Sequence, residues 1–314
     1  MYDKLRFWID MAVVGGQAQT IANNLDRAHT HIDCQTGEEN VYGSIMGLKV
    51  SIYASGVSVV GSLPKFLYGS NIYPLDRHST ADAVAKLSDT LHVDANKANV
   101  TSLEFGTTFL MKKPVADYLP KLVSMPRLDR YSFNTSTLYF KGKGRNPSKV
   151  FAFYDKAADI KDKGMMCPED LKQANLLRYE MRINNRLAAQ LGLRRLKAST
   201  LAEKPFYRQL VKRYQNNYFS IQKLNQMKAN AISGIRTVKD AYDVLVARLI
   251  TESDNNAIKS YIDELKAAGV FDDRKNYTRL KSKLQDVASK ADFTVTDDLI
   301  KELDNDIKNC GAYV

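Results

Sequence analysis

The stretch KVFAFYDKAADI, residues 149–160, alternates large aromatic residues with small or polar ones before a helical pattern begins. Successive side chains of a β-strand point to opposite faces, so Phe151 and Phe153 share one face while Ala152, Tyr154 and Lys156 share the other. The phenylalanine face is expected to pack on a core. The opposite face is then a candidate functional surface, on which the small Ala152 leaves room for a ligand to approach.

Three other segments divide in the same way, and together they place a mixed set of charges on one side of a sheet. They are residues 102–108, 137–143 and 176–183, each with apolar residues on its other face. The polar face of the four strands carries Glu104, Tyr139, Lys141, Lys143, Tyr154, Lys156, Arg178, Glu180 and Arg182. A charged face is also common on antiparallel sheets that only meet solvent. The set found here combines acids, bases and a tyrosine, which favours a site over a solvated surface.

The order of the segments predicts an α+β protein with a largely antiparallel sheet, covered by helices on one face. Strand patterns dominate residues 1–206, with short links between them. From residue 207 the hydrophobic period changes from two to about 3.6, so residues 207–314 are expected to form an all-helical C-terminal region. We therefore predict two domains, 1–206 and 207–314.

The distribution of charge points to a polyanionic partner. The 314-residue chain carries a net charge of +11, which divides into −2 over residues 1–100, +10 over 101–200 and +3 over 201–314. The positive charge thus lies in the segment that contains Tyr154. A solvated basic surface explains this excess as well as a nucleic acid does, whereas no basic amphipathic helix suggests a membrane surface.

The same sequence predicts a cytoplasmic protein. It contains no run of about 18 apolar residues, so no membrane-spanning helix is expected. Charges interrupt the apolar N-terminal stretch, which argues against a signal peptide. Three distant cysteines, Cys34, Cys167 and Cys310, have no zinc-binding spacing and are typical of reduced thiols.

The polar face has the components of a phosphodiester-cleaving site. Two carboxylates, Glu104 and Glu180, can hold one Mg²⁺ or Mn²⁺ through oxygen ligands, and the cations around them can hold phosphates. A tyrosine hydroxyl has a pKa of about 10 and is a poor nucleophile alone. A metal that polarises the phosphate, with Lys156 close by, would allow Tyr154 to attack it.

Five stretches, read in order, resemble the rolling-circle replication initiators of filamentous bacteriophages, the gene II protein type. They are MYDKLRFWID (1–10), THIDC (30–34), SLEFGTTF (102–109), VFAFYDK (150–156) and LLRYEMRINNR (176–186). The most specific pair is Tyr-x-Lys after an apolar strand, followed by Arg-aromatic-Glu-x-Arg-Ile. The resemblance covers about the first 200 residues and extends more distantly to plasmid initiators of the replication–relaxation type.

The resemblance implies a metal-dependent, origin-specific endonuclease and ligase with a fold similar to the HUH nucleases, an antiparallel five-stranded sheet with helices. The family's nucleophile falls on Tyr154 and its following lysine on Lys156, while its two acids fall on Glu104 and Glu180. The first acid is Glu where the family pattern has Asp, and Leu103 stands where the pattern has a basic residue. Such an enzyme forms a 5′-phosphotyrosyl intermediate and frees a 3′-hydroxyl primer.

The partners implied are origin DNA, as supercoiled duplex and single strand, and also a host helicase and a second copy of the chain in a bacterial cytoplasm. The predicted DNA-contacting residues lie in the basic loop 141–149 and on the polar face: Lys141, Lys143, Arg145, Lys149, Arg178 and Arg182. His31 is a reserve metal ligand, from a near match to a histidine–hydrophobe–histidine motif at His29–His31 that has Thr30 in its centre. Two ordinary surface histidines explain the same pattern.

Two other functions fit parts of the sequence. A non-catalytic DNA-binding replication regulator on the same fold is the main alternative, because the first acid and the histidines depart from the family pattern. A polymerase-like or primase-like nucleotidyl transferase also uses paired acids on a sheet. The sequence has neither a phosphate-binding glycine loop of the P-loop type nor an adjacent acid pair, which disfavours the transferase.

Overall fold

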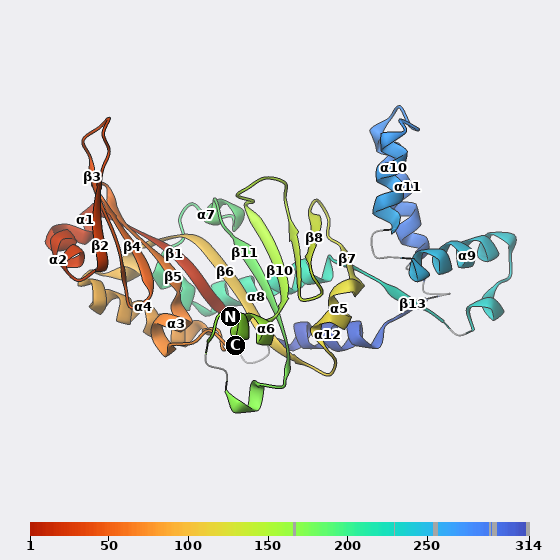
Figure 1. The fold of residues 1–314 in the computed structure, drawn as a ribbon, viewed down its shortest axis with the longest axis horizontal. Coiled ribbons are helices and arrows are strands. Elements are labelled where there is room, and N and C mark those ends of the chain that lie inside the picture. Colours follow the sequence, from red (N-terminus) through yellow and green to blue (C-terminus); the bar gives the residue numbers. More distant parts are fainter. Residues whose placement is uncertain (166–167, 229, 254–256, 289, 291–293, 312–314) are drawn as a thin grey trace.

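The computed structural model describes residues 1–314 except 166–167, 229, 254–256, 289, 291–293 and 312–314. Its main feature is one large antiparallel sheet (Figure 1). In chain order its strands are β1 (Tyr2–Asp10), β2 (Asp26–Ile32), β3 (Glu39–Ile45), β4 (Leu48–Tyr53), β5 (Gly56–Ser62), β6 (Asn99–Met111), β8 (Asp129–Phe133), β9 (Thr137–Lys141), β10 (Lys149–Asp155) and β11 (Asn175–Ile183).

The α+β class and the antiparallel pairing are confirmed, but the expectation of five strands is wrong. The sheet has ten strands in the order β2-β3-β4-β5-β1-β6-β11-β10-β9-β8. The difference arises because β2, β3, β4 and β5 form a meander of consecutive hairpins, and the last of these strands, β5, pairs with β1. The hairpin of β8 and β9 extends the other side of the sheet beyond β10.

Helices surround this sheet and continue beyond it. The α-helices are α1 (Met11–Val14), α2 (Ala18–Asn23), α3 (Leu63–Tyr68), α4 (Arg77–Leu91), α5 (Val115–Tyr118), α6 (Lys156–Asp162), α7 (Leu187–Gln190), α8 (Lys204–Phe219), α9 (Val238–Glu252), α10 (Ala257–Ala267), α11 (Arg274–Ala288) and α12 (Asp298–Asn309). The 3-10 helices are η1 (Gly15–Gln17), η2 (Ala95–Lys97), η3 (Leu119–Lys121), η4 (Glu169–Leu171), η5 (Ala198–Ala202) and η6 (Ala231–Gly234). In the described part of the chain, no helix is both long and apolar enough to cross a bilayer.

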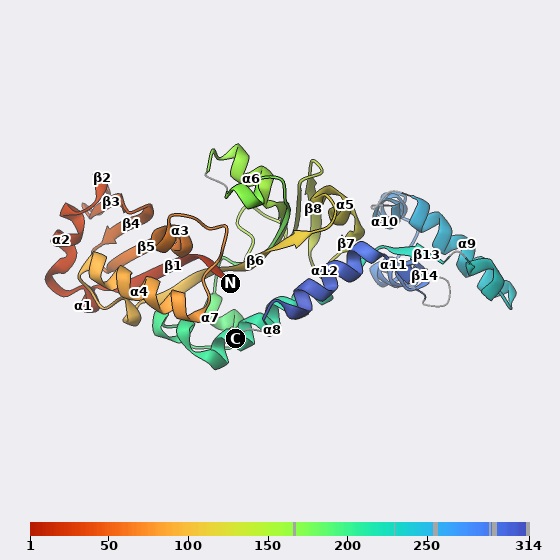
Figure 2. The ribbon, with the colours of Figure 1, turned by 90° about the horizontal axis from the view of Figure 1, so that it is seen from below.

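Helix α8 covers the apolar face of the central strands. Its Tyr214 ring lies 4.3 Å from the ring of Tyr179 in β11, which in turn stacks at 4.4 Å on Phe153 of β10. All three rings are fully buried. Figure 2 shows α4, α8 and α12 along one side of the sheet and α6 on the other.

The region after residue 206 is not purely helical. Short strands occur there as β12 (Gln222–Lys223), β13 (Asn225–Met227) and β14 (Thr294–Thr296); β12 pairs with β7 (Leu122–Ser124) and β13 pairs with β14. The domain boundary predicted after residue 206 lies inside α8, and both α8 and α12 contribute to the main core. Helices α9, α10 and α11 pack mainly on one another and project beside the sheet (Figure 1).

The cysteines that the structure describes are free thiols. Cys34 is exposed and Cys310 is partly buried, whereas Cys167 lies outside the described residues.

Candidate active site

The register of the central strands brings the predicted site residues close together. Glu180 of β11 lies opposite Ala152 of β10 on one side and opposite Gly106 of β6 on the other. A Cβ on Gly106 would lie 2.3 Å from the carbonyl oxygen of Tyr179 and 2.9 Å from Cγ of Glu180. Only glycine fits at this point, because the Glu180 side chain passes directly over it.

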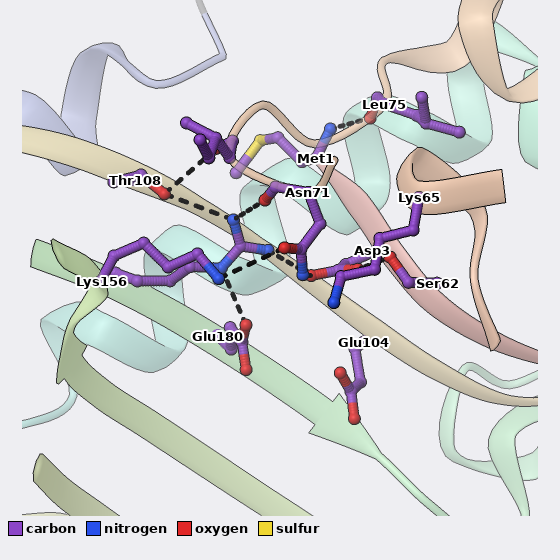
Figure 3. A network of polar contacts seen from close by, with 12 residues as sticks. Met1, Asp3, Ser62, Lys65, Asn71, Leu75, Glu104, Thr108, Lys156 and Glu180 are labelled. Carbon is purple, nitrogen blue, oxygen red and sulfur yellow. Dashed lines mark hydrogen bonds and ion pairs between the residues drawn. The ribbon is translucent and has the colours of Figure 1, made fainter. Parts of the chain in front are cut away.

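Three carboxylates from three strands converge on the polar face. One oxygen each from Asp3 in β1, Glu104 in β6 and Glu180 in β11 lie within 4.8 Å of one another, and we call these residues the acidic cluster. Figure 3 shows the three side chains among their hydrogen-bonding neighbours. In the part of the chain that the structure describes, no other trio of His, Cys, Asp or Glu has this spacing. Carboxylate oxygens are the ligands that Mg²⁺ and Mn²⁺ prefer, so the donor set fits such an ion.

Asp3 is a member of the acidic cluster that the sequence patterns did not reveal. Strict alternation along β1 would place Asp3 on the core face with Leu5. In the structure Tyr2 pairs with Phe105 while Leu5 pairs with Leu103, so three steps on β1 match two on β6. This β-bulge turns Asp3 toward the polar face. The signal available in the sequence was that Tyr2 and Leu5 are both large apolar residues at an odd spacing of three, which strict alternation would put on opposite faces. In the structure both are buried.

Two arginines hold the acidic cluster in place. The fully buried Arg178 donates from Nη2 to Asp3 Oδ2 at 2.6 Å and from Nε to Glu180 Oε1 at 2.8 Å. Arg182 donates from Nη2 to Glu180 Oε2 at 2.6 Å. Burial alone would raise the pKa of Glu180, but Arg178 and Arg182 outweigh burial and lower this pKa to about 2. Glu180 is therefore ionised at neutral pH.

Glu104 is less well paired than its neighbours. Its closest cation, Arg182 Nε, lies 3.9 Å from Oε1. Burial raises the pKa of Glu104 to about 7; Arg182 opposes this shift, while Glu180 and Asp3 add to it. The carboxyl group of Glu104 thus changes its charge near neutral pH.

Tyr154 lies at the edge of the acidic cluster. Its hydroxyl donates a hydrogen bond to Glu180 Oε1 at 2.8 Å. Burial, with the nearby Glu180 charge, raises the pKa of this phenol well above its ordinary value. The phenol is therefore neutral here, and its oxygen is held in one orientation.

Lys156 was expected on the same strand face as Tyr154, but the strand ends one residue earlier. Asp155 caps α6, so Lys156 is the first residue of that helix. Its side chain is 1% exposed, and its ammonium group donates to Asp159 Oδ2 at 2.9 Å and to Asn71 Oδ1 at 3.3 Å. It lies 6.0 Å from the centre of the Tyr154 ring, so the helix start still brings this positive charge to the site.

The predicted DNA-contacting residues occupy several places. Lys141, Arg145 and Arg182 line one hollow of about 740 Å³ beside Glu104, whereas Lys143 lines another of about 420 Å³ that α10 and α11 help to form.

Two of the predicted contacts are not on the open polar surface. Arg178 has no exposed surface and serves the acidic cluster. Lys149 points to the opposite face of β10 from Val150, which is the face that α8 covers. Burial there, together with the charge of Arg213, lowers the pKa of Lys149.

His31, the reserve metal ligand, is far from the acidic cluster. It lies exposed in β2 at the outer edge of the sheet, four strand positions from β1 (Figure 1). At about 4.8 Å per strand this is roughly 19 Å. The structure therefore does not bring His31 to the site.

Fold and site together define an α+β protein with carboxylates and arginines gathered on one face of its central sheet. Residues 1–203, about two thirds of the chain, match the family model that describes the N-terminal part of a phage replication-associated protein. The chain belongs to this family, the gene II type of filamentous phages, which confirms the resemblance seen in the sequence. It is accordingly a DNA-replication protein of the kind that initiates rolling-circle replication, and the family supports an endonuclease in general. No individually curated protein matches the chain significantly.

Proposed function

We propose that the polar sheet face is the active site of a DNA nicking–closing endonuclease, in which Tyr154 is the nucleophile. Membership of the replication-associated family supplies the biological setting, the start of rolling-circle replication at an origin. The observation that carries the proposal is the 2.8 Å hydrogen bond from the Tyr154 hydroxyl to Glu180, at the edge of the acidic cluster.

In the proposed reaction the Tyr154 oxygen attacks the phosphorus of one phosphodiester, and the bond from phosphorus to the 3′-oxygen breaks. The phenol loses its proton and the 3′-oxygen gains one. The products are a 5′-phosphotyrosyl protein and a free 3′-hydroxyl that can prime synthesis. Because the phosphotyrosine conserves the energy of the broken bond, attack by a 3′-hydroxyl in the reverse direction reseals the strand.

Glu180 orients the Tyr154 hydroxyl, and Arg178 and Arg182 fix Glu180 in turn. We assign Arg178 this positioning role instead of a direct DNA contact, because its guanidinium has no exposed surface. Lys156 supplies positive charge 6.0 Å from the Tyr154 ring, which favours the negative charge that develops on the phenol oxygen during attack.

A divalent cation belongs to this proposal. Asp3, Glu104 and Glu180 would hold Mg²⁺ or Mn²⁺, which would supply positive charge that polarises the phosphodiester. A host helicase and a second copy of the chain stay predictions from the family resemblance.

The test is a nicking assay on supercoiled DNA that carries the element's own origin, with Mg²⁺ or Mn²⁺ and with the intact protein or Tyr154→Phe. Tyr139→Phe is a matched control, because Tyr139 lies on the same sheet face, opposite Ala152 on the neighbouring strand. The intact protein and the control should give open-circular DNA with protein attached at its 5′ end, and Tyr154→Phe should give none.

Two results would count against the proposal. Equal nicking by Tyr154→Phe would mean that another group is the nucleophile. Tight, salt-sensitive binding without nicking by any form, in the presence of metal, would favour the DNA-binding regulator on the same fold.

A further inference from the structure

A hollow of about 740 Å³ opens on the polar face beside the acidic cluster, and its lining combines aromatic rings with cations. Its volume is in the range of about 300–1,000 Å³ that is typical of small-ligand sites. Five cationic side chains face one carboxyl group there: Lys4, Arg6, Lys141, Arg145 and Arg182 against Glu104. This lining suits an anion that also carries an aromatic ring.

The aromatic part of the lining comes from the β8–β9 hairpin. Phe133 ends β8 and is 55% exposed, although a large apolar side chain gains free energy from burial. Its ring meets Tyr139 edge to face, with the centroids 5.8 Å apart. Arg182 lies over the Tyr139 ring at 5.9 Å and links this pair to Glu180. Phe133 is thus an exposed ring on a support that is tied to the proposed active site.

The hollow extends along the sheet from Val150 to the level of the proposed nucleophile. Its exposed ring, Phe133, belongs to a residue that pairs with Thr137 of β9, and Thr137 pairs with Tyr154 of β10. Phe133 is therefore two strands away from Tyr154, roughly 10 Å at about 4.8 Å per strand. A strand whose scissile phosphate is at Tyr154 would therefore place a neighbouring nucleotide in the hollow.

We propose that this hollow binds one unpaired nucleotide of the DNA strand, with its base stacked on Phe133 and its phosphate near Lys141 and Arg145. A base inside a duplex is already stacked on both sides, so the site selects DNA that is locally single-stranded. The position of the nucleotide next to the scissile phosphate rests on the function proposed above. The stacking itself does not, because it requires no cleavage.

Two oligomers separate stacking from phosphate contact. One is a labelled 12-nucleotide oligothymidylate; the other is a 12-mer with the same sugar–phosphate backbone but abasic residues throughout. Binding to the full chain is measured by fluorescence anisotropy in EDTA, so that no metal-dependent reaction occurs. Phe133→Ala should weaken oligothymidylate binding about 5- to 150-fold, the range found when one base–aromatic stack is removed, and leave abasic binding within about twofold.

Three variants act as controls. Phe133→Tyr keeps an aromatic ring and should bind oligothymidylate like the intact protein. Tyr242→Ala removes a similarly exposed ring, 63% exposed in α9, and should change neither affinity. Lys141→Gln should weaken both oligomers and reduce the slope of log affinity against log salt by about 0.7, the value for one phosphate contact on a single strand.

Equal losses for the two oligomers in Phe133→Ala, or no loss for either, would overturn the stacking site. So would a failure of Phe133→Tyr to bind oligothymidylate normally. The result is independent of the nicking assay, because binding in EDTA requires no cleavage. Stacking without nicking would therefore refute the proposed reaction alone, and nicking without stacking would refute only this inference.

Discussion

Gly106→Ala tests whether the site depends on the close passage of Glu180 over β6. The added Cβ would lie 2.3 Å from the Tyr179 carbonyl oxygen, 2.9 Å from Glu180 Cα and 2.9 Å from Glu180 Cγ. Overpacking of this kind costs about 1–3 kcal/mol, while glycine to alanine within a strand returns roughly 0.5–1 kcal/mol. Two of the three contacts are backbone atoms, which cannot move without opening the β6–β11 ladder. The cost is therefore expected at the upper end of its range, near 3 kcal/mol, which leaves a net loss of about 2 kcal/mol in the free energy of unfolding.

The same substitution should impair the proposed reaction more than the fold. Displacement of Glu180 moves the hydrogen-bond acceptor of Tyr154, and a misplacement of about 1 Å can lower a rate about 100-fold. A loss of that size in the rate of origin nicking is expected from protein that is still folded at the assay temperature.

Urea unfolding followed by circular dichroism measures the stability, and conversion of supercoiled to open-circular DNA measures the rate. Gly16→Ala is the matched control, because a Cβ on Gly16 meets nothing within 4 Å and the residue lies outside the predicted DNA-contacting loop. It should leave both quantities nearly unchanged. If Gly106→Ala behaves like Gly16→Ala in both assays, the close-contact argument is wrong.

Three further predictions follow from the acidic cluster. Arg178→Met should lower stability by about 3–5 kcal/mol in urea unfolding, because it leaves Asp3 and Glu180 buried without their shared cation; a loss below about 1 kcal/mol would contradict this. Folding raises the pKa of Glu104 from 4.5 to about 7, so the folded state holds the proton of this carboxyl group more tightly than the unfolded state does. The stability that Glu104 contributes is therefore full below about pH 4.5 and is lost as the pH rises toward and through 7. In EDTA, Glu104→Gln should therefore gain about 2–3 kcal/mol relative to the intact protein between pH 5 and pH 8, and a difference that does not vary with pH would refute the assignment. Asp3→Asn removes one of three carboxylates and should weaken Mn²⁺ binding, measured by calorimetry, at least tenfold. His31→Ala should leave Mn²⁺ binding unchanged. The opposite pattern would restore His31 as a ligand.

The faces of the central strands were predictable because alternation is a local property of an extended backbone. Once residues 149–155 are extended, Tyr154 and Phe153 must point to opposite sides. The same rule placed Glu104, Glu180 and Arg182 on the polar face, and the register of β6, β10 and β11 agrees with it.

Where the backbone departs from ideal geometry, the local rule fails. The bulge between Tyr2 and Leu5 brings Asp3 into the acidic cluster, and the end of β10 at Asp155 moves Lys156 from a strand to the first turn of a helix. The bulge depends on pairing with β6, about 100 residues away in the chain, whereas the cap is a local hydrogen bond from Ala158 N to Asp155 that strand alternation does not describe.

The sequence by itself determined the α+β class, the polar face around Tyr154 and the membership of a replication-associated family, because all three depend on residue types and their spacing along the chain. Only the tertiary structure decided the number of strands and the separation of His31 from the site. The convergence of Asp3 with Glu104 and Glu180 was decided at the same level. These features depend on which strands pair with which. Pairing is set by contacts between distant residues, such as Asp3 and Arg178, which are 175 positions apart. Alternation and composition carry no information on such contacts.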